Sequence, residues 1–335
     1  MLQNLPQKKL KRINKMKILY AGSPEAARRT LEILFEKQAE CGFEIAGVLS
    51  NPPSAKGRHK DLIPTPVAAF AEEKGLPVFT PEHLDAACRE QIKPLGADVL
   101  VCFAYGHIFG PKFLEMFPLG GMNLHPSLLP KYRGCTPVPA AILNRDTQTA
   151  VTIQTLSLGM DEGQILAQKV VELNGTETGA SLLNYSAECG SGLLCGLLQK
   201  LVAGETLEGR AQEGEPSYTG IIKKEDGKID WAEDGLKIEA KIRAYFPEPG
   251  CWCLEKGLPL RILSSCFIAD TDARAEAWKN EPNGKVLSFV KPEGIYIKAN
   301  GGILCVKTLQ RQGKKEMTYK DFMNGARDFI GSQLE

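Results

Sequence analysis

Short apolar runs alternate with helix-length segments across residues 17–203, and this alternation constrains the fold more than any other feature. Residues 97–103 form a near-continuous apolar run, which is typical of a strand buried on both faces of a parallel sheet. The alternation predicts an α/β fold with a doubly wound, mostly parallel sheet that binds ligands outside the carboxyl ends of its strands. The expected strands are 17–21, 43–50, 77–79, 97–103, 121–124, 150–156 and 164–171. The expected helices are 25–40, 67–74, 138–144 and 179–203, with Ser23 as the cap of the first.

The pattern changes after residue 203. Residues 204–230 are rich in Gly and Glu without a sustained period and are expected to form a linker. A helix near 233–244 is followed by five short apolar runs separated by turn residues, which predict a small β-barrel of the oligonucleotide-binding type. These strands are expected near 251–255, 260–267, 284–290, 294–299 and 303–308. The predicted domains are a disordered basic extension (1–15), a catalytic domain (16–203), the linker (204–230) and the barrel (231–335).

Charge and composition narrow the classes of partner. The formal net charge of the 335 residues is +1, so a nucleic acid must be bound by local basic clusters rather than by the overall field. The sequence has no apolar stretch near the roughly 18 residues of a membrane helix and no apolar secretory signal, so we expect a cytoplasmic protein without a membrane partner. The ten cysteines are scattered, and several lie in apolar runs. This favours free buried thiols over a disulfide framework or a zinc site.

Two polar side chains mark a candidate site. Asn123 and His125 are two residues apart at the end of an expected strand, so they should share one face of the sheet. An asparagine amide can donate to an oxygen that gains negative charge, and imidazole transfers protons near neutral pH. A histidine beside a strand is more often structural, but Asp161 lies between two glycines in a connection between strands. There it can orient the imidazole and raise its pKa, which makes Asn123, His125 and Asp161 the candidate catalytic residues.

Other chemistries have weaker support. Ser127 lies near His125 but lacks the Gly-x-Ser-x-Gly elbow of a hydrolase. Cys135 and His125 could form a nucleophilic pair, although nothing nearby indicates a stabilised thiolate. His107, His125 and Asp161 could ligate a metal, but four histidines without His-x-x-x-His spacing argue against it, and no metal is expected. The first turn has no Gly-x-Gly-x-x-Gly and the chain has no Walker motif, which disfavours an oxidoreductase or an ATPase.

Three motifs together resemble the folate-dependent formyltransferases. They are Phe-Ala-Tyr-Gly at 103–106, Asn-Leu-His-Pro-Ser-Leu-Leu-Pro-x-Tyr-Arg-Gly at 123–134 and Gly-Met-Asp-x-Gly at 159–163. The resemblance implies a Rossmann-like core, 10-formyltetrahydrofolate as co-substrate, and Asn123, His125 and Asp161 as catalytic groups. The residues predicted to bind folate are Phe103, Tyr105, Gly106, Ser127, Leu128, Leu129 and Pro130.

From Met16 onward, nearly the whole chain resembles the members of this family that formylate methionyl-tRNA. The supporting stretches are 21–24, 56–67, 228–231, 242–250, 313–317 and 321–325. The resemblance implies that the loop carrying Arg58 inserts toward the tRNA acceptor end and that the barrel binds tRNA. The predicted tRNA contacts are Lys56, Arg58, Lys60, Lys314 and Lys315. The chain has Phe246-Pro247 where the family often has Asn-Pro, and Pro52-Pro53 where its loop commonly has Pro-Asp.

The expected activity is transfer of a formyl group from 10-formyltetrahydrofolate to the free α-amine of methionyl initiator tRNA, for translation initiation. Asn123 and a protonated His125 are expected to hold the formyl oxygen, and Asp161 to keep His125 charged and take the amine proton through water. No obligate protein partner is inferred. The rival hypotheses are formylation of glycinamide ribonucleotide or of an amino sugar nucleotide, hydrolysis of formyl-folate, and a non-catalytic RNA-binding module.

Overall fold

The computed structural model describes residues 15–56 and 61–335. The predicted extension up to residue 14 and the predicted tRNA contacts Arg58 and Lys60 lie outside the described residues.

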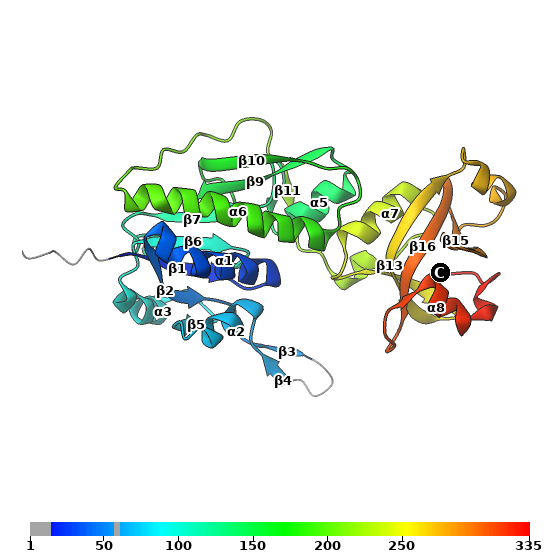
Figure 1. The fold of residues 1–335 in the computed structure, drawn as a ribbon, viewed down its shortest axis with the longest axis horizontal. Coiled ribbons are helices and arrows are strands. Elements are labelled where there is room, and N and C mark those ends of the chain that lie inside the picture. The colour runs from blue at the N-terminus through cyan, green and yellow to red at the C-terminus, as the bar shows by residue number, and fades with distance from the viewer. Residues whose placement is uncertain (1–14, 57–60) are drawn as a thin grey trace, which may run out of the picture. The chain divides into compact units, whose positions relative to one another are not determined.

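A mostly parallel sheet dominates the first half of the chain (Figure 1). In the described part of the chain its order is β10-β9-β7-β6-β1-β2-β5. Strand β1 pairs in parallel with β2 and β6, β2 with β5, and β6 with β7. The predicted fold class is therefore confirmed. The strands are β1 (Met16–Gly22), β2 (Phe43–Leu49), β5 (Val78–Phe79), β6 (Val99–Phe103), β7 (Gly121–His125), β9 (Gln148–Thr155) and β10 (Ile165–Glu172).

The helices of this half follow the predicted order, and α1 packs against β1 and β2. They are α1 (Glu25–Cys41), α2 (Pro66–Glu73), α3 (Ala86–Ile92), the 3-10 helix η1 (Lys93–Leu95), α4 (Pro111–Leu114), α5 (Pro137–Leu143) and α6 (Gly179–Val202). Helices α3 and α4 were not predicted, and neither was the hairpin of β3 (Ser54–Lys56) and β4 (Asp61–Ile63).

The predicted cap of the first helix is wrong. The N-cap residue of α1 is Pro24, and no side chain caps the helix. The Ser23 hydroxyl instead accepts a hydrogen bond from Asn51 N at 3.2 Å and lies 3.4 Å from the Ser50 hydroxyl. The hydroxyl is thus used to join the carboxyl ends of β1 and β2.

The C-terminal half begins with α7 (Gly235–Ala244) and continues as an antiparallel sheet in the order β12-β13-β16-β15-β14. Residues 331–335 bridge its two ends: Leu254 N donates to Glu335 O at 2.7 Å, and Val286 N donates to Ser332 O at 2.9 Å. This closure gives the predicted small barrel. Its elements are β12 (Cys251–Glu255), β13 (Leu258–Ala269), β14 (Val286–Val290), β15 (Gly294–Ala299), β16 (Gly302–Arg311), β17 (Met317–Thr318), α8 (Tyr319–Asn324), and the 3-10 helices η3 (Ala273–Trp278) and η4 (Arg327–Phe329).

The predicted linker contains regular structure. Strand β11 (Tyr218–Thr219) pairs in parallel with β8 (Arg133–Gly134), and the 3-10 helix η2 (Lys224–Gly227) follows. The pair is short, but it ties the segment after residue 211 to the loop that follows His125.

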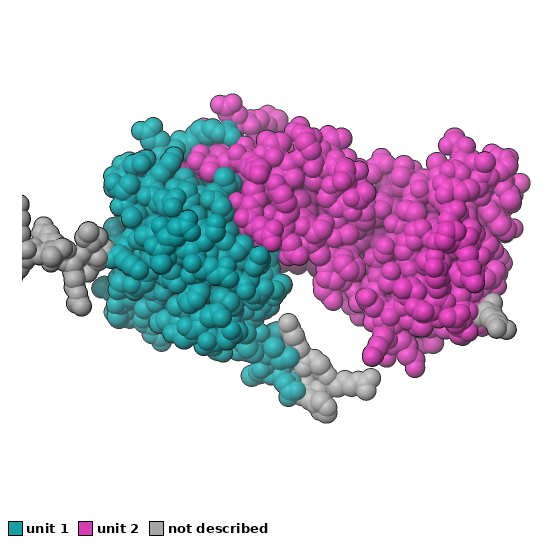
Figure 2. All heavy atoms as spheres, in the orientation of Figure 1, with its two compact units in different colours: residues 1–124, 153–158, 190–210 teal, residues 125–152, 159–189, 211–335 magenta. Residues whose placement is uncertain are grey.

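The chain divides into two compact units (Figure 2). Unit 1 comprises 1–124, 153–158 and 190–210, and unit 2 comprises 125–152, 159–189 and 211–335. Within unit 1, Leu19, Leu49 and Leu100 belong to one apolar cluster that includes the ring of Phe113. Within unit 2, an apolar core joins helix α5 to helix α7 and the barrel strands. Among the described residues no helix is long and apolar enough to cross a membrane.

Candidate active site

Strand β7 presents Asn123 and His125 on one face, because they are two residues apart in an extended strand. Leu124 points to the opposite face and is buried. Asn123 is opposite Cys102 in the pairing with β6. His125 is the last residue of the strand and is itself buried. The structure therefore brings these two predicted catalytic residues together at a strand's carboxyl end.

Both ring nitrogens of His125 face an oxygen. Nε2 lies 2.9 Å from the Tyr132 carbonyl, and Nδ1 lies 3.5 Å from Oδ1 of Asp161. Because a carbonyl oxygen can only accept, Nε2 must carry a hydrogen in this arrangement. In the neutral ring Nδ1 then holds a lone pair on the side of Asp161. The 3.5 Å separation exceeds the usual hydrogen-bond distance.

The pKa of His125 is lowered from its ordinary value, and this corrects an expectation. Burial disfavours the charged ring and is the largest effect. The charge of Asp161 and the hydrogen bond to Tyr132 raise the pKa but only partly offset burial. The predicted influence of Asp161 has the right sign, but the net direction is opposite, and the lowered pKa favours the neutral ring.

Asp161 is held in an unusual backbone conformation. Its φ of 54° lies in the left-handed region, which is costly for a residue with a side chain. Its Oδ2 accepts a hydrogen bond from Gly134 N at 2.8 Å. Gly134 has φ 105°, and a Cβ there would collide with the carbonyl oxygen of Thr219 on β11. Only glycine therefore fits at the residue that holds the carboxylate.

The segment 127–130, predicted to contact folate, is tightly built. The Ser127 hydroxyl donates to Lys131 O at 2.6 Å, and Ser127 O accepts from the Thr152 hydroxyl at 2.7 Å. Leu129 and Pro130 are buried, whereas Leu128 is half-buried. Leu128 therefore has the side chain of this segment that is most available to a ligand.

The motif 103–106 lies in unit 1. Phe103 and Tyr105 are each 2% exposed, and Tyr105 stacks on Phe109 with ring centroids 5.5 Å apart. Their side chains are thus occupied by packing, which leaves backbone atoms and the exposed Gly106 for contact with a ligand. The Tyr105 carbonyl accepts from the Asn51 amide at 3.1 Å, so this loop is joined to the end of β2.

The described tRNA candidates lie in two separate elements. Lys56 is the last residue of β3, and Lys314 and Lys315 are exposed in the turn between β16 and β17. Sequence reasoning missed a further residue, Gln212, whose amide contacts the Asp161 loop. Gln212 lies in the aperiodic Gly- and Glu-rich segment, where only the β-prone Tyr218–Thr219 pair hinted at structure.

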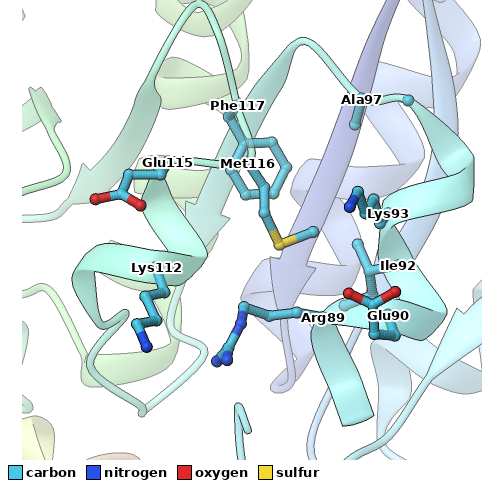
Figure 3. A pocket seen from close by; sticks show the side chains of 10 residues that line it. Arg89, Glu90, Ile92, Lys93, Ala97, Lys112, Glu115, Met116 and Phe117 are labelled. Carbon is cyan, nitrogen blue, oxygen red and sulfur yellow. The ribbon is translucent and has the colours of Figure 1, made fainter. Parts of the chain in front are cut away.

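The structure also contains a pocket of about 410 Å³ in unit 1 (Figure 3). It lies near the start of β6, opposite to the strand end at which the candidate residues are found. None of the predicted site residues lines it. Its lining residues come from α3, η1, α4 and the adjoining turns: Arg89, Glu90, Ile92, Lys93, Gly96, Ala97, Lys112, Glu115, Met116 and Phe117.

Known structures share this fold at low sequence identity. A methionyl-tRNA formyltransferase from Clostridium thermocellum superposes with a TM-score of 0.54 at 17% identity, covering 75% of this chain and 93% of that one. HypX from Aquifex aeolicus in complex with tetrahydrofolic acid superposes with a TM-score of 0.63 at 14% identity, covering 93% of this chain and 47% of HypX. These likenesses concern the fold alone.

Sequence comparisons reach further. The formyl transferase family model matches residues 14–196, and the model of the formyl transferase C-terminal domain matches residues 221–327. The methionyl-tRNA formyltransferase of Treponema denticola is 41% identical over 96% of this chain and 100% of its own length. That of Dictyoglomus thermophilum is 34% identical, again over 96% and 100%. The chain therefore belongs to the methionyl-tRNA formyltransferase family.

Proposed function

We propose that the protein transfers the formyl group of 10-formyltetrahydrofolate to the free α-amine of methionyl initiator tRNA, in the cytoplasm. Family membership supports the reaction and the tRNA substrate. The tetrahydrofolic acid bound by a protein of the same fold supports folate as the donor. One observation carries the mechanism: β7 places an asparagine amide two residues from a buried imidazole, whose Nδ1 edge faces a carboxylate.

This donor set fits a formyl group presented to an amine. The folate supplies an activated formyl carbon, and the chain must supply a donor for its oxygen and a base for the amine. The Asn123 amide donates to the formyl oxygen as negative charge develops on it. An α-amine has an ordinary pKa of about 7.7–8.0, so part of the substrate is already unprotonated near neutral pH.

His125 acts as the base in this proposal, through Asp161. Asp161 Oδ1, which lies 3.5 Å from the neutral Nδ1, takes the proton that the amine loses as the new C–N bond forms and passes it to Nδ1. The resulting imidazolium is stabilised by Asp161 at Nδ1 and by the Tyr132 carbonyl at Nε2. His125 then gives this proton to the folate nitrogen as its bond to the formyl carbon breaks. The amine proton ends on the folate, so the reaction is balanced without a metal or a covalent enzyme intermediate.

Binding of the two substrates is assigned to the predicted contacts. Ser127–Pro130 and the backbone of 103–106 contact the folate in this proposal, and Leu128 supplies apolar surface. Lys56, Arg58, Lys60, Lys314 and Lys315 contact the tRNA, where lysine and arginine pair with phosphate oxygens. The proposed domains are 16–203 for catalysis, 204–230 as linker and 231–335 for tRNA.

The first test is a direct assay. Purified protein is incubated with 10-formyltetrahydrofolate and methionyl initiator tRNA, and formylmethionine is measured after base hydrolysis. Asn123→Ala should lower turnover about 100- to 1000-fold, since it removes one donor to the developing oxyanion. Folate affinity, measured by calorimetry, should stay within about threefold. Asn174→Ala, a change at an exposed asparagine after β10, serves as the control and should retain full turnover.

Unchanged turnover in Asn123→Ala would remove this residue from the mechanism. Loss of formyl-folate without formylmethionine would indicate a hydrolase. Formyl transfer to glycinamide ribonucleotide or to a sugar nucleotide, but not to the tRNA, would keep the chemistry and overturn the substrate.

A further inference from the structure

The segment that follows residue 211 reaches the backbone of the Asp161 loop through one side chain. The Gln212 amide nitrogen donates to Asp161 O and to Gly163 O, each at 2.8 Å. Both hydrogens of the amide nitrogen are thus used on one turn of the chain. That turn includes the left-handed backbone of Asp161, a conformation that persists only when its surroundings enforce it.

Arg133 determines which way the Gln212 amide points. Its Nε and Nη2 donate to Gln212 Oε1 at 3.1 and 2.8 Å. The reverse orientation would place the amide nitrogen against the guanidinium and its oxygen against two carbonyls, which cannot form hydrogen bonds. The orientation therefore follows from its neighbours. Only 12% of the Arg133 side chain is exposed, and Nη1 also donates to the Tyr218 hydroxyl at 3.0 Å.

The same short stretch holds the carboxylate. Gly134, next to Arg133, donates its N–H to Asp161 Oδ2 at 2.8 Å, while Oδ1 faces His125 Nδ1. The Asp161 side chain is thus held through Gly134, and its backbone through Gln212 and Arg133. The residue just before β11 holds this stretch further, because Tyr132 N donates to the Ser217 hydroxyl at 2.9 Å.

We infer that Gln212 is a positioning residue for the reaction: it holds the Asp161 loop so that the carboxylate stays against His125 Nδ1. Gln212 does not reach the imidazole in these contacts and acts through Asp161. The inference rests on the proposed roles of His125 and Asp161. It makes the predicted linker a part of the catalytic assembly.

The test compares Gln212→Leu, which removes the amide at similar size, with Gln212→Glu. The glutamate variant keeps an oxygen toward Arg133 but has no hydrogen for the two carbonyls. Both should lower kcat about 10- to 100-fold, with KM for folate and for methionyl-tRNA within about threefold. The neighbouring exposed Glu213→Gln is the control and should keep full activity. Thermal unfolding and circular dichroism identify variants that fail to fold. If Gln212→Leu fails to fold, the test rests on Gln212→Glu.

Two readouts separate positioning from a general structural role. The charge of Asp161 raises the pKa of His125, so a displaced carboxylate should move the acid limb of the kcat profile to lower pH. Asp161→Asn is expected to move it in the same direction. The double variant of Gln212→Leu and Asp161→Asn should be no slower than Asp161→Asn alone.

The positioning role would be overturned if the loss of kcat in the double variant equalled the product of the two single losses. It would also be overturned if the acid limb of the kcat profile stayed at the same pH in the Gln212 variants. A rise in KM for methionyl-tRNA at unchanged kcat would show a substrate contact instead and would overturn it as well. If Asp161→Asn itself kept full kcat, the proposed mechanism would fail first. If Asp161→Asn were crippled while Gln212→Leu were not, only the inference about Gln212 would fail.

Discussion

At the scale of single residues, the environment of His125 decides its protonation. The ring is buried, donates from Nε2 to a backbone carbonyl, and turns its other nitrogen toward a carboxylate. Each partner favours the charged ring, yet removal from water outweighs both. A neutral imidazole beside a carboxylate can take up a proton during the reaction and be stabilised once it has done so.

This lowered pKa has a consequence for stability. The unfolded chain binds a proton at His125 near the ordinary pKa of about 6.5, whereas the folded chain binds it only at lower pH. Stability should therefore fall as the pH drops below about 6.5 and toward the lowered pKa. His125→Gln should show a weaker loss of unfolding free energy between pH 7.5 and 5.5, measured by urea titration. Equal losses in both proteins would show that burial does not govern this residue.

At the scale of elements, two very short strands fix the position of the loop that contacts His125 and Asp161. β8 and β11 pair over two residues each, and the approach of their backbones at Gly134 leaves no room for a side chain. The Thr219 hydroxyl accepts from Thr136 N at 3.0 Å, so β11 also secures the start of helix α5. The loop that hydrogen-bonds to both His125 and Asp161 is thereby held at β8 and at the start of α5.

Gly134→Ala tests this pairing. The added methyl would meet Thr219 O, and φ of 105° is unfavourable for alanine, so we expect a loss of about 1–3 kcal/mol in unfolding free energy. Turnover should fall as well, because the N–H that holds Asp161 moves. Gly220→Ala is the matched control, since a Cβ there meets nothing within 4 Å. If both variants lose the same stability, the close approach at Gly134 is not the cause.

Much of this fold could be predicted from the sequence because its strands and helices are long enough to show a period. Strand β15 falls on residues 294–299 as predicted, and β6 begins two residues later than predicted. The period gives no signal for β8 and β11, which are two residues long, or for the β3–β4 hairpin. The neutral state of His125 and the place of Gln212 depend on burial and on contacts between distant segments. The local sequence pattern predicts neither the protonation of His125 nor the contacts of Gln212.

At the scale of the whole molecule, charge is balanced, with a formal net of +1. Affinity for an RNA substrate must then come from a few local cations, and each phosphate contact should contribute a salt dependence of its own. The predicted contacts are divided between the loop around Arg58 and the turn that carries Lys314 and Lys315. Two sites of contact on one chain can select a large substrate without a strongly basic surface.

Arg58→Ala should raise Kd for methionyl-tRNA and lower the slope of log K against log salt by about one, with folate affinity unchanged. Filter binding at several salt concentrations measures both quantities. Lys112→Ala removes an exposed cation beside the pocket of Figure 3 and is the control. An identical slope in Arg58→Ala and the unaltered protein would exclude a phosphate contact at Arg58.

The pairing of Gln212 with the Asp161 loop also orders events during synthesis. The two residues are separated by 51 positions, so a ribosome makes His125 and Asp161 well before it reaches Gln212. A nascent chain that ends before residue 212 already contains His125 and Asp161 but lacks the side chain that bonds to the Asp161 loop. In the proposed mechanism the geometry of this pair is therefore completed only after residue 212 has been translated.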